Sequence, residues 1–225
     1  MPMARKVKEE AEKTHEMILK SAVLLFADKG YDKTTLNDIA ESLNMTKGAI
    51  YWHFESKEKL LIELLDSALE HFRNDLDAVM PDGELTFVAV AKMMIKNACG
   101  MIGDRLGEAF FRLVHSGIKW SGGSMSHFRE DFITRDKIGP KQAFEKSILN
   151  DCRAGRAKSE IAARADEISS IAMAIWDGLV KQKIDGFLSC DLGIALTHAY
   201  SAIWDNIRIA ENTNGFAMAD EGILN

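Results

Sequence analysis

The chain has 225 residues, of which 47% are hydrophobic, and a net charge of −6, so it can bury a substantial core in one or two domains. Its 28% charged residues and three prolines argue against a low-complexity chain and a many-turned all-β protein, and they favour helices. The first 17 residues lack the apolar segment of a secretory signal, and no run of about 18 uncharged apolar residues indicates a membrane span. We therefore expect a helical cytoplasmic protein with no membrane partner.

The net negative charge argues against a nucleic-acid partner only if it is spread evenly. Residues 1–60 hold ten Lys or Arg and ten Asp or Glu, so the remainder, with 18 basic and 24 acidic residues, carries the whole acidic excess. The N-terminal part is locally neutral, and a DNA-binding surface there requires that its basic residues share one face.

The residues that catalysis or metal binding needs are present but scattered. Cys99, Cys152 and Cys190 are widely spaced without a C-x-x-C pair, which favours reduced, mostly buried thiols over a disulfide framework. An all-α alternative, a di-iron carboxylate enzyme, needs two Glu-x-x-His motifs, and the chain has one, Glu12 to His15. Neither G-x-S-x-G nor a phosphate-binding loop occurs. We expect no enzymatic activity, metal or cofactor.

Helical periodicity begins near the N-terminus. A helix from Thr14 to Lys29, ended by Gly30, is predicted by one apolar face: Ile18, Ala22, Leu25 and Phe26. A short second helix follows a capping-box-like pair, Thr35 and Asp38. Its apolar face is Leu36, Ile39, Ala40 and Leu43. Asn44 then tolerates the left-handed turn that ends this helix, with Met45 placed to pack back on it.

A third helix is predicted to begin at the cap Thr46. Ile50 and Phe54, four residues apart, point inward, so Gly48, Tyr51 and Trp52 fall on the opposite side.

Ser56 is placed to cap a long fourth helix that reaches Met80 before the breaker cluster Pro81 to Gly83. Its single apolar stripe comprises Leu60, Leu61, Leu64, Leu65, Ala68, Leu69, Phe72 and Leu76. Because this stripe is continuous, we place the domain boundary within the helix. Further helices are predicted at 84–101, 104–119, 125–134, 140–153, 165–187 and 191–211.

Residues 34–60 read TTLNDIAESLNMTKGAIYWHFESKEKL. This segment resembles the DNA-binding signature of the TetR family of transcription regulators, over about residues 14–65. The matching features are Thr35, Ile39, Ala40, Thr46, Gly48, the run from Ile50 to Phe54, Lys57 and Leu60. Ala49 to Phe54 is particularly similar to multidrug-efflux repressors of that family. Asn44 departs from the usual Gly, and Asn can adopt the same turn.

The resemblance implies that the third helix is a recognition helix in the major groove of operator DNA. The residues expected to contact DNA are Thr35, Thr46, Lys47, Gly48, Ala49, Tyr51, Trp52, His53 and Lys57. Gly48 allows a close approach, and Tyr51, His53 and Lys57 hold phosphates. Base reading falls mainly to Lys47, Ala49 and Trp52.

We therefore expect an all-α protein with an N-terminal three-helix helix-turn-helix domain, residues 1–60. A long helix joins it to a helical ligand-binding and dimerisation domain, residues 61–225. The expected homodimer seam comprises Ile168, Ile171, Ala172, Ile175, Trp176, Leu179, Ala195, His198, Ala199, Ala202 and Ile203. A twofold dimer sets two recognition helices about 34 to 36 Å apart. The alternative is that these two helices only close the core of the protomer.

A pocket for a small ligand of unknown identity is expected among aromatic and Met side chains: Phe110, Phe111, His115, Trp120, Phe128, Phe132, Met173 and Trp176. The alternative is that these side chains are ordinary residues of the hydrophobic core. The expected function is a repressor that a small apolar or amphipathic ligand releases from its operator, with efflux genes as first candidates. The alternatives are a helical dimeric small-molecule-binding protein without DNA binding, and a lipid or metabolic regulator without an efflux role.

Overall fold

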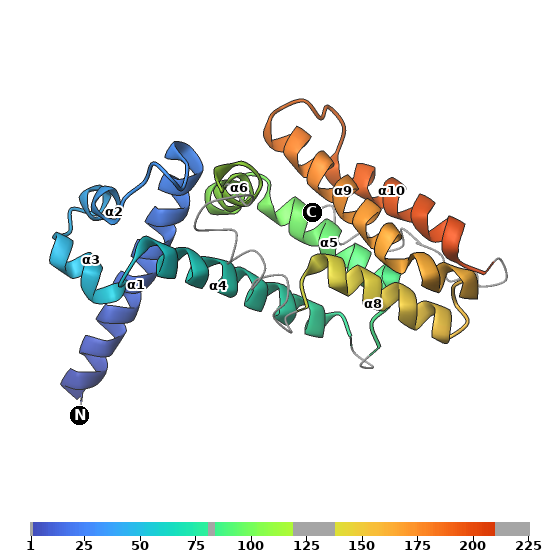
Figure 1. Cartoon of the computed structure of the whole chain (residues 1–225), viewed down its shortest axis with the longest axis horizontal. Coiled ribbons are helices and arrows are strands. Elements are labelled where there is room, and N and C mark those ends of the chain that lie inside the picture. The colour runs from blue at the N-terminus through green and yellow to red at the C-terminus, as the bar shows by residue number, and fades with distance from the viewer. Residues whose placement is uncertain (1, 81–83, 119–137, 210–225) are drawn as a thin grey trace. The chain divides into compact units, whose positions relative to one another are not determined.

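The computed structural model describes residues 2–80, 84–118 and 138–209, and these residues form helices with one isolated bridge between Ala157 and Arg208 (Figure 1). The chain divides into two compact units. The first comprises Met1–Ala68 and Asp104–Asp136, and the second comprises Leu69–Gly103 and Lys137–Asn225. The all-α fold class is confirmed. The described part of the chain holds no helix that is both long and apolar enough to cross a membrane.

The first unit is built from helices of very different length. They are α1 (Pro2–Lys29), α2 (Leu36–Ser42), α3 (Lys47–His53), the start of α4 (Lys57–Ala78), α6 (Arg105–Arg112) and the π-helical turn η1 (Leu113–Gly117). The helix α1 begins at Pro2 rather than at the predicted Thr14. Ion pairs one turn apart, such as Lys8 with Glu12 at 3.8 Å, support the part of α1 before Thr14, which lacks the apolar face of the later turns.

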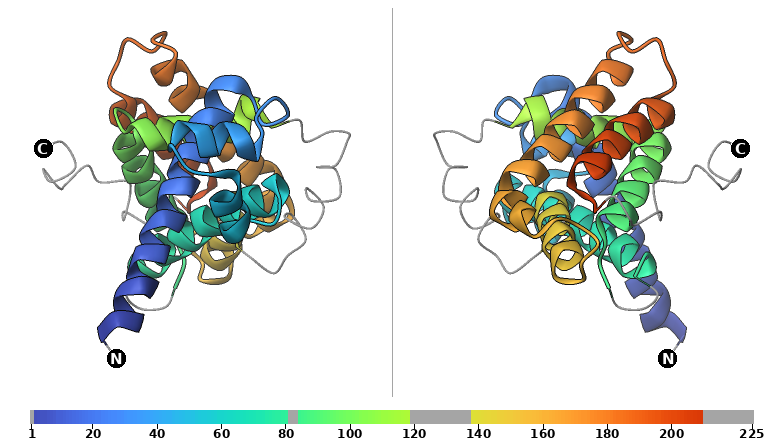
Figure 2. Two further views of the ribbon diagram at one scale, coloured as in Figure 1. Left: turned by 90° about the vertical axis from the view of Figure 1, so that its left-hand side faces the viewer. Right: turned by 90° about the vertical axis from the view of Figure 1, so that its right-hand side faces the viewer.

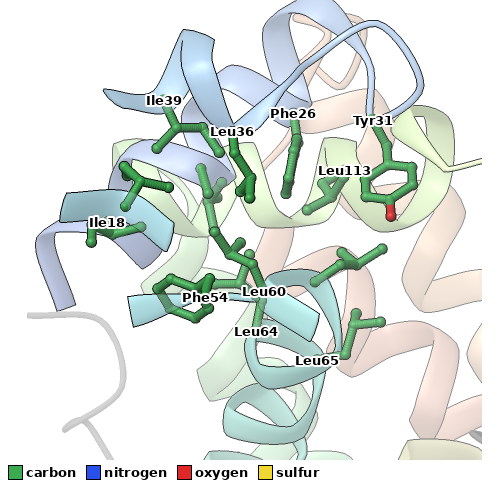
Figure 3. Packing of buried hydrophobic residues seen from close by; sticks show 14 of the residues in the cluster. Ile18, Phe26, Tyr31, Leu36, Ile39, Phe54, Leu60, Leu64, Leu65 and Leu113 are labelled. Carbon is green, nitrogen blue, oxygen red and sulfur yellow. The ribbon is translucent and has the colours of Figure 1, made fainter. Parts of the chain in front are cut away.

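One hydrophobic core holds this unit together, with side chains from each of its helices (Figure 3). Ile18, Phe26, Ile39, Ile50, Leu60, Leu61, Leu65 and Leu113 in this core are fully buried. Because Leu61, Ala109 of α6 and Leu113 of η1 lie in the same core as the helix-turn-helix, the compact unit includes α6 and does not end at residue 60. The division by packing therefore differs from the predicted boundary between residues 60 and 61.

In the described residues of the second unit, four helices form a closed arrangement, and the end of α4 belongs to the same unit. These are α5 (Phe87–Met101), α8 (Pro140–Arg153), α9 (Ala165–Ile184) and α10 (Leu192–Ile207), with the 3₁₀ turn η2 (Ser159–Arg164) before α9. The helix α8 packs on α9, α9 on α10, α10 on α5 and α5 on α8 (Figure 2). The helices α5 and α10 begin after capping side chains: Thr86 accepts from Ala89 N at 3.2 Å, and Asp191 accepts from Ile194 N at 2.8 Å.

A buried carboxylate ties the start of α5 to the end of α8. Asp151 has no exposed surface, and its carboxylate accepts from Phe87 N at 2.8 Å and from Arg156 Nε at 2.7 Å. Arg156 also donates to Glu84 at 2.7 Å. Burial raises the pKa of Asp151, and the hydrogen bonds from Phe87 and Arg156 oppose that rise. The contacts of Asp151 with Phe87 and of Arg156 with Glu84 join residues more than 60 positions apart.

The remaining predicted elements match the structure at their starts better than at their ends. The helix α9 ends at Ile184 rather than at residue 187, because Gly186 adopts a φ of +77° and the N–H of Phe187 returns to Gln182 O at 2.8 Å. The predicted helix at 125–134 lies outside the described residues.

The cysteines differ in exposure. Cys99 and Cys152 are half-buried and Cys190 is exposed, so the expectation of mostly buried thiols is wrong for Cys190. Burial raises the pKa of the Cys99 and Cys152 thiols, which disfavours the reactive thiolate there.

Candidate nucleic-acid interface

The helix α2 begins at the predicted capping box. Thr35 Oγ1 accepts from Asp38 N at 3.1 Å, and the Asp38 carboxylate accepts from Thr35 N at 2.7 Å. These hydrogen bonds from Thr35, aided by Lys29 at 3.6 Å, lower the pKa of Asp38. The hydroxyl of Thr35 also donates to Asp38 at 2.5 Å. Thr35 therefore orients α2, and its contact with DNA stays a prediction.

The turn between α2 and α3 has the predicted left-handed residue. Asn44 has a φ of +53°. Its N–H donates to Glu41 O at 3.1 Å, and the N–H of Met45 donates to Ala40 O at 2.8 Å, which is the paired bonding of a Schellman motif. Met45 packs back against the core as predicted. The turn thus sets the direction of α3 through backbone hydrogen bonds.

The helix α3 has one buried side and one exposed side. Thr46 Oγ1 caps it by accepting from Ala49 N at 3.2 Å. Ile50 is fully buried and Phe54 is 3% exposed, whereas Tyr51 is 53% and Trp52 73% exposed. Apolar side chains as large as these two rarely remain uncovered on a soluble protein without a partner.

The other predicted contacts are distributed around this exposed side. Lys47 and Gly48 are exposed, and Ala49 and His53 are half-buried. A Cβ on Gly48 would meet only Thr46 Oγ1, at 4.0 Å. Packing within the chain therefore gives no reason for glycine at this helical position.

Lys57 is engaged with the protein's own backbone. Its Nζ donates to Tyr31 O at 2.7 Å and to Asp32 O at 3.4 Å, and lies 4.3 Å from the centroid of the Tyr31 ring. Burial lowers the pKa of Lys57, against the charges of Asp32 and Asp38. Two of the three ammonium donors point at carbonyls, so one remains for a phosphate. Ser56 caps α4 beside it, accepting from Lys59 N at 3.1 Å.

His53 is the last residue of α3 and lies at the edge of its exposed side. Its ring lies edge-on to Trp52, with centroids 4.6 Å apart, and 5.7 Å from the ring of His15. Burial, and then the charge of His15, lower the pKa of His53. His15 forms a hydrogen bond with Glu63 on α4. Sequence reasoning missed His15 and Glu63, since no local pattern links residues 48 positions apart.

The predicted ligand-pocket residues fall in three groups. Phe110, Phe111 and His115 lie in α6 and η1 of the first unit, where Phe111 and His115 stack with ring centroids 4.2 Å apart. Met173 and Trp176 lie on α9 of the second unit, where Trp176 Nε1 donates to Met94 O at 3.0 Å.

The third group, Trp120, Phe128 and Phe132, lies outside the described residues. The pocket therefore stays a prediction. Across residues 2–80, 84–118 and 138–209, no three His, Cys, Asp or Glu side chains are placed to hold a metal ion.

The predicted dimer seam separates into inner and outer residues. Ile168, Ala172 and Trp176 are buried within the protomer. The outer residues remain exposed or half-exposed: Ile171, Ile175, Leu179, Ala195, His198, Ala199, Ala202 and Ile203. An apolar face thus remains along α9 and α10 of the single chain, with Ile171 46% exposed.

Comparisons with known proteins agree with this geometry. Residues 18–64 match the sequence profile of bacterial regulatory proteins of the tetR family. The probable acrEF/envCD operon repressor of Escherichia coli K12 is 52% identical over 62 residues, or 28% of each chain. The transcriptional regulator TtgR of Pseudomonas putida is 48% identical over 68 residues, covering 30% of this chain and 32% of its own. The match thus spans less than a third of the length of these relatives.

The likeness to solved structures extends over most of the chain. SmeT of Stenotrophomonas maltophilia, in its complex with triclosan, superposes with a TM-score of 0.71 at 18% identity. The superposition covers 88% of this chain and 93% of SmeT. The helical fold is therefore shared across both units, while close sequence similarity is confined to the helix-turn-helix. Residues 18–64 thus match the tetR family of bacterial regulatory proteins, and this helix-turn-helix segment is similar to that of a probable operon repressor.

Proposed function

We propose that this protein is a dimeric transcriptional repressor that binds operator DNA through α3 and leaves it when a small apolar or amphipathic ligand binds. The observation that carries the proposal is the exposed side of α3, where Tyr51 and Trp52 stand beside Lys47 and a glycine that internal packing does not require. A duplex in contact with this side covers the aromatic rings and uses the space above Gly48.

The whole-chain proposal has support from named relatives. The E. coli relative is a probable operon repressor, and SmeT is the repressor of a multidrug efflux pump. We propose by analogy that efflux genes are the first candidates for regulation and that the protein acts in the cytoplasm.

The dimer and the ligand response are parts of the same proposal. The outer residues of α9 and α10 form an apolar face that a second copy can cover around a twofold axis. The helix α4 contributes residues to both units, so a ligand bound by the second unit can act on the DNA-binding helices through it. If triclosan, used as a probe, binds the protein without changing its affinity for operator DNA, the release mechanism is wrong for that ligand class.

The primary experiment measures binding to the DNA upstream of the protein's own gene by fluorescence anisotropy. We expect sequence-selective binding that weakens steeply with salt. A protein that binds this DNA and a scrambled duplex equally, or neither, is not an operator-binding repressor.

Gly48→Ala separates DNA approach from folding. An alanine should stabilise the exposed helix by about 0.5–1 kcal/mol, yet weaken DNA binding because its methyl group occupies the space in front of α3. Gly100→Ala on α5 is the matched control, since its added Cβ also meets nothing within 4 Å. Unchanged DNA affinity in Gly48→Ala would show that DNA binding does not require a residue without a side chain at position 48.

Two further variants test single contacts. Tyr51→Phe removes one hydroxyl from the exposed side of α3, and Lys57→Ala removes a charge at the start of α4. Both should weaken DNA binding without unfolding the protein, and Lys57→Ala should reduce the salt slope by about 1. Wild-type affinity in both variants contradicts these assignments.

A further inference from the structure

A polar pair that is not among the nine residues expected to contact DNA lies next to the end of the recognition helix. His15, in the middle of α1, forms a hydrogen bond through Nε2 with Glu63 Oε1 on α4. Its ring stacks on Phe54, with centroids 4.5 Å apart and planes inclined by 23°. It also lies 5.7 Å from the ring of His53. Three helices therefore meet around one imidazole.

The contacts continue from this imidazole to the exposed side of α3. Phe54 is the residue at which α3 ends. His53, the last helical residue, holds Trp52 edge-on at 4.6 Å, and Trp52 is 73% exposed. A movement of His15 is thus transmitted through ring contacts to two residues expected to touch DNA.

The pair is not simply part of the hydrophobic core. The side chains of His15 and Glu63 are 29% and 46% exposed, so water can solvate both polar groups if they separate. Stability alone gives little reason for the His15–Glu63 pair, because partly exposed ion pairs contribute little to the free energy of folding. A role in fixing the geometry of the interface accounts for its position.

We propose that His15, held by Glu63, is a positioning residue of the DNA interface that fixes the end of α3 and the rings of His53 and Trp52. The proposal rests on the DNA-binding function proposed above and adds two residues to it. Neither residue is required to touch DNA.

Charged and titratable groups surround the pair on three helices. His15 faces Glu63 from α4 and His53 from α3, with Lys59 one turn before Glu63. On α1, Glu12 and Glu16 flank His15, and their own ion pairs are with Lys8 and Lys20 at 3.8 and 3.9 Å.

The charge of His15 is one cause of the lowered pKa of His53. Removing that charge should raise the pKa of His53, so that His53 becomes charged, and binds phosphate better, at a higher pH.

The test compares variants of the full-length protein on the upstream DNA, by anisotropy as a function of pH. His15→Ala removes both the ring and the hydrogen bond to Glu63. It should weaken DNA binding about tenfold, since residues in direct contact couple strongly. Glu63→Gln keeps an amide that can bond to His15 but loses the charge, and should weaken binding less. The double variant should be no weaker than His15→Ala, because both changes break the same contact.

His71→Ala and Glu70→Gln are the matched controls. Both residues are exposed on α4 beyond the first unit, and both variants should bind DNA like the wild type.

The variant His15→Phe provides a measurement that should not change if His15 has only a structural role. Phenylalanine can stack on Phe54 but carries no charge, so the NMR titration of His53 should shift to a higher pH. The pH at which DNA binding strengthens on acidification should rise with it. This measurement also covers the case in which His15→Ala fails to fold.

Three results overturn the positioning role: folded His15→Ala that binds like the controls, losses in the single variants that simply add, or an unmoved His53 titration in His15→Phe. Absence of DNA binding by the wild type instead overturns the proposed function, and with it any DNA role for His15. Normal wild-type binding with an unaffected His15→Ala variant overturns the role of His15 alone.

Discussion

The two compact units are held together in different ways. In the first, successive helices begin and end at local signals: the Thr35–Asp38 capping box, the left-handed Asn44 and the Thr46 cap. In the second, the decisive polar contacts are long-range: Asp151 accepts from Phe87 N, and Arg156 donates to Glu84. The same difference is seen in the comparisons with known proteins. The helix-turn-helix is similar to that of its relatives in sequence, whereas the rest of the chain is similar to solved structures only in fold. The geometry of the proposed DNA-binding surface depends on helix ends set locally, whereas a helical bundle tolerates many sequences that fill its core.

The largest expected effect tests the long-range contacts of the second unit. Arg156→Ala leaves the buried Asp151 carboxylate without its guanidinium and should lower the free energy of unfolding by about 3–5 kcal/mol. Urea unfolding can follow each unit through the NMR signals of Trp204 and Trp52, which lie in the second and first unit. The control Arg164→Ala breaks an exposed pair with Glu167, and it should lower the free energy of unfolding much less because exposed ion pairs contribute little to stability. Equal losses in both variants would remove the special role of Asp151.

A second prediction concerns the two sides of α3. Ile50→Ala empties a fully buried position and should destabilise the first unit by about 2–5 kcal/mol. Trp52→Ala, two residues away on the exposed side, should change stability by no more than about 0.5 kcal/mol while weakening DNA binding. Thermal unfolding and anisotropy on both variants separate the two effects. If Trp52→Ala is as destabilising as Ile50→Ala, the exposed side is not free for a partner.

The local signals themselves are tested by Thr35→Ala. Loss of the cap should destabilise the first unit by about 1 kcal/mol, measured as a lower urea midpoint for the Trp52 signal. Thr14→Ala is the control, because the Thr14 hydroxyl only donates back to Glu10 O within α1, and alanine favours a helix interior. A midpoint unchanged by Thr35→Ala would mean that tertiary packing, rather than the cap, sets the start of α2.

The smallest effects are expected at the turn between α2 and α3. Asn44→Gly should leave stability within about 0.5 kcal/mol of the wild type, because glycine adopts a positive φ freely. Asn44→Ala should cost about 1 kcal/mol, since a Cβ disfavours this conformation. Urea unfolding compares the two variants, and a more stable alanine variant would contradict the role of the left-handed turn.

Much of the local geometry of α2 and α3 was predictable because its signals are short-range. Capping residues act within three positions, and a 3.6-residue period separates Ile50 and Phe54 from Tyr51 and Trp52. The engagement of Lys57 with Tyr31 was not predictable in the same way. It depends on the return of the chain from α1 to α4, which no local pattern encodes.

The sequence by itself determined the helical class, the ends of α2 and α3, and the side of α3 that stays uncovered, because helix caps and apolar periodicity are properties of neighbouring residues. Only the tertiary structure decided that α6 packs in the core of the first unit, that His15 meets Glu63, and that the buried Asp151 carboxylate accepts from Phe87 N. Each of these joins residues far apart in the chain, and their pairing follows from how whole helices pack together.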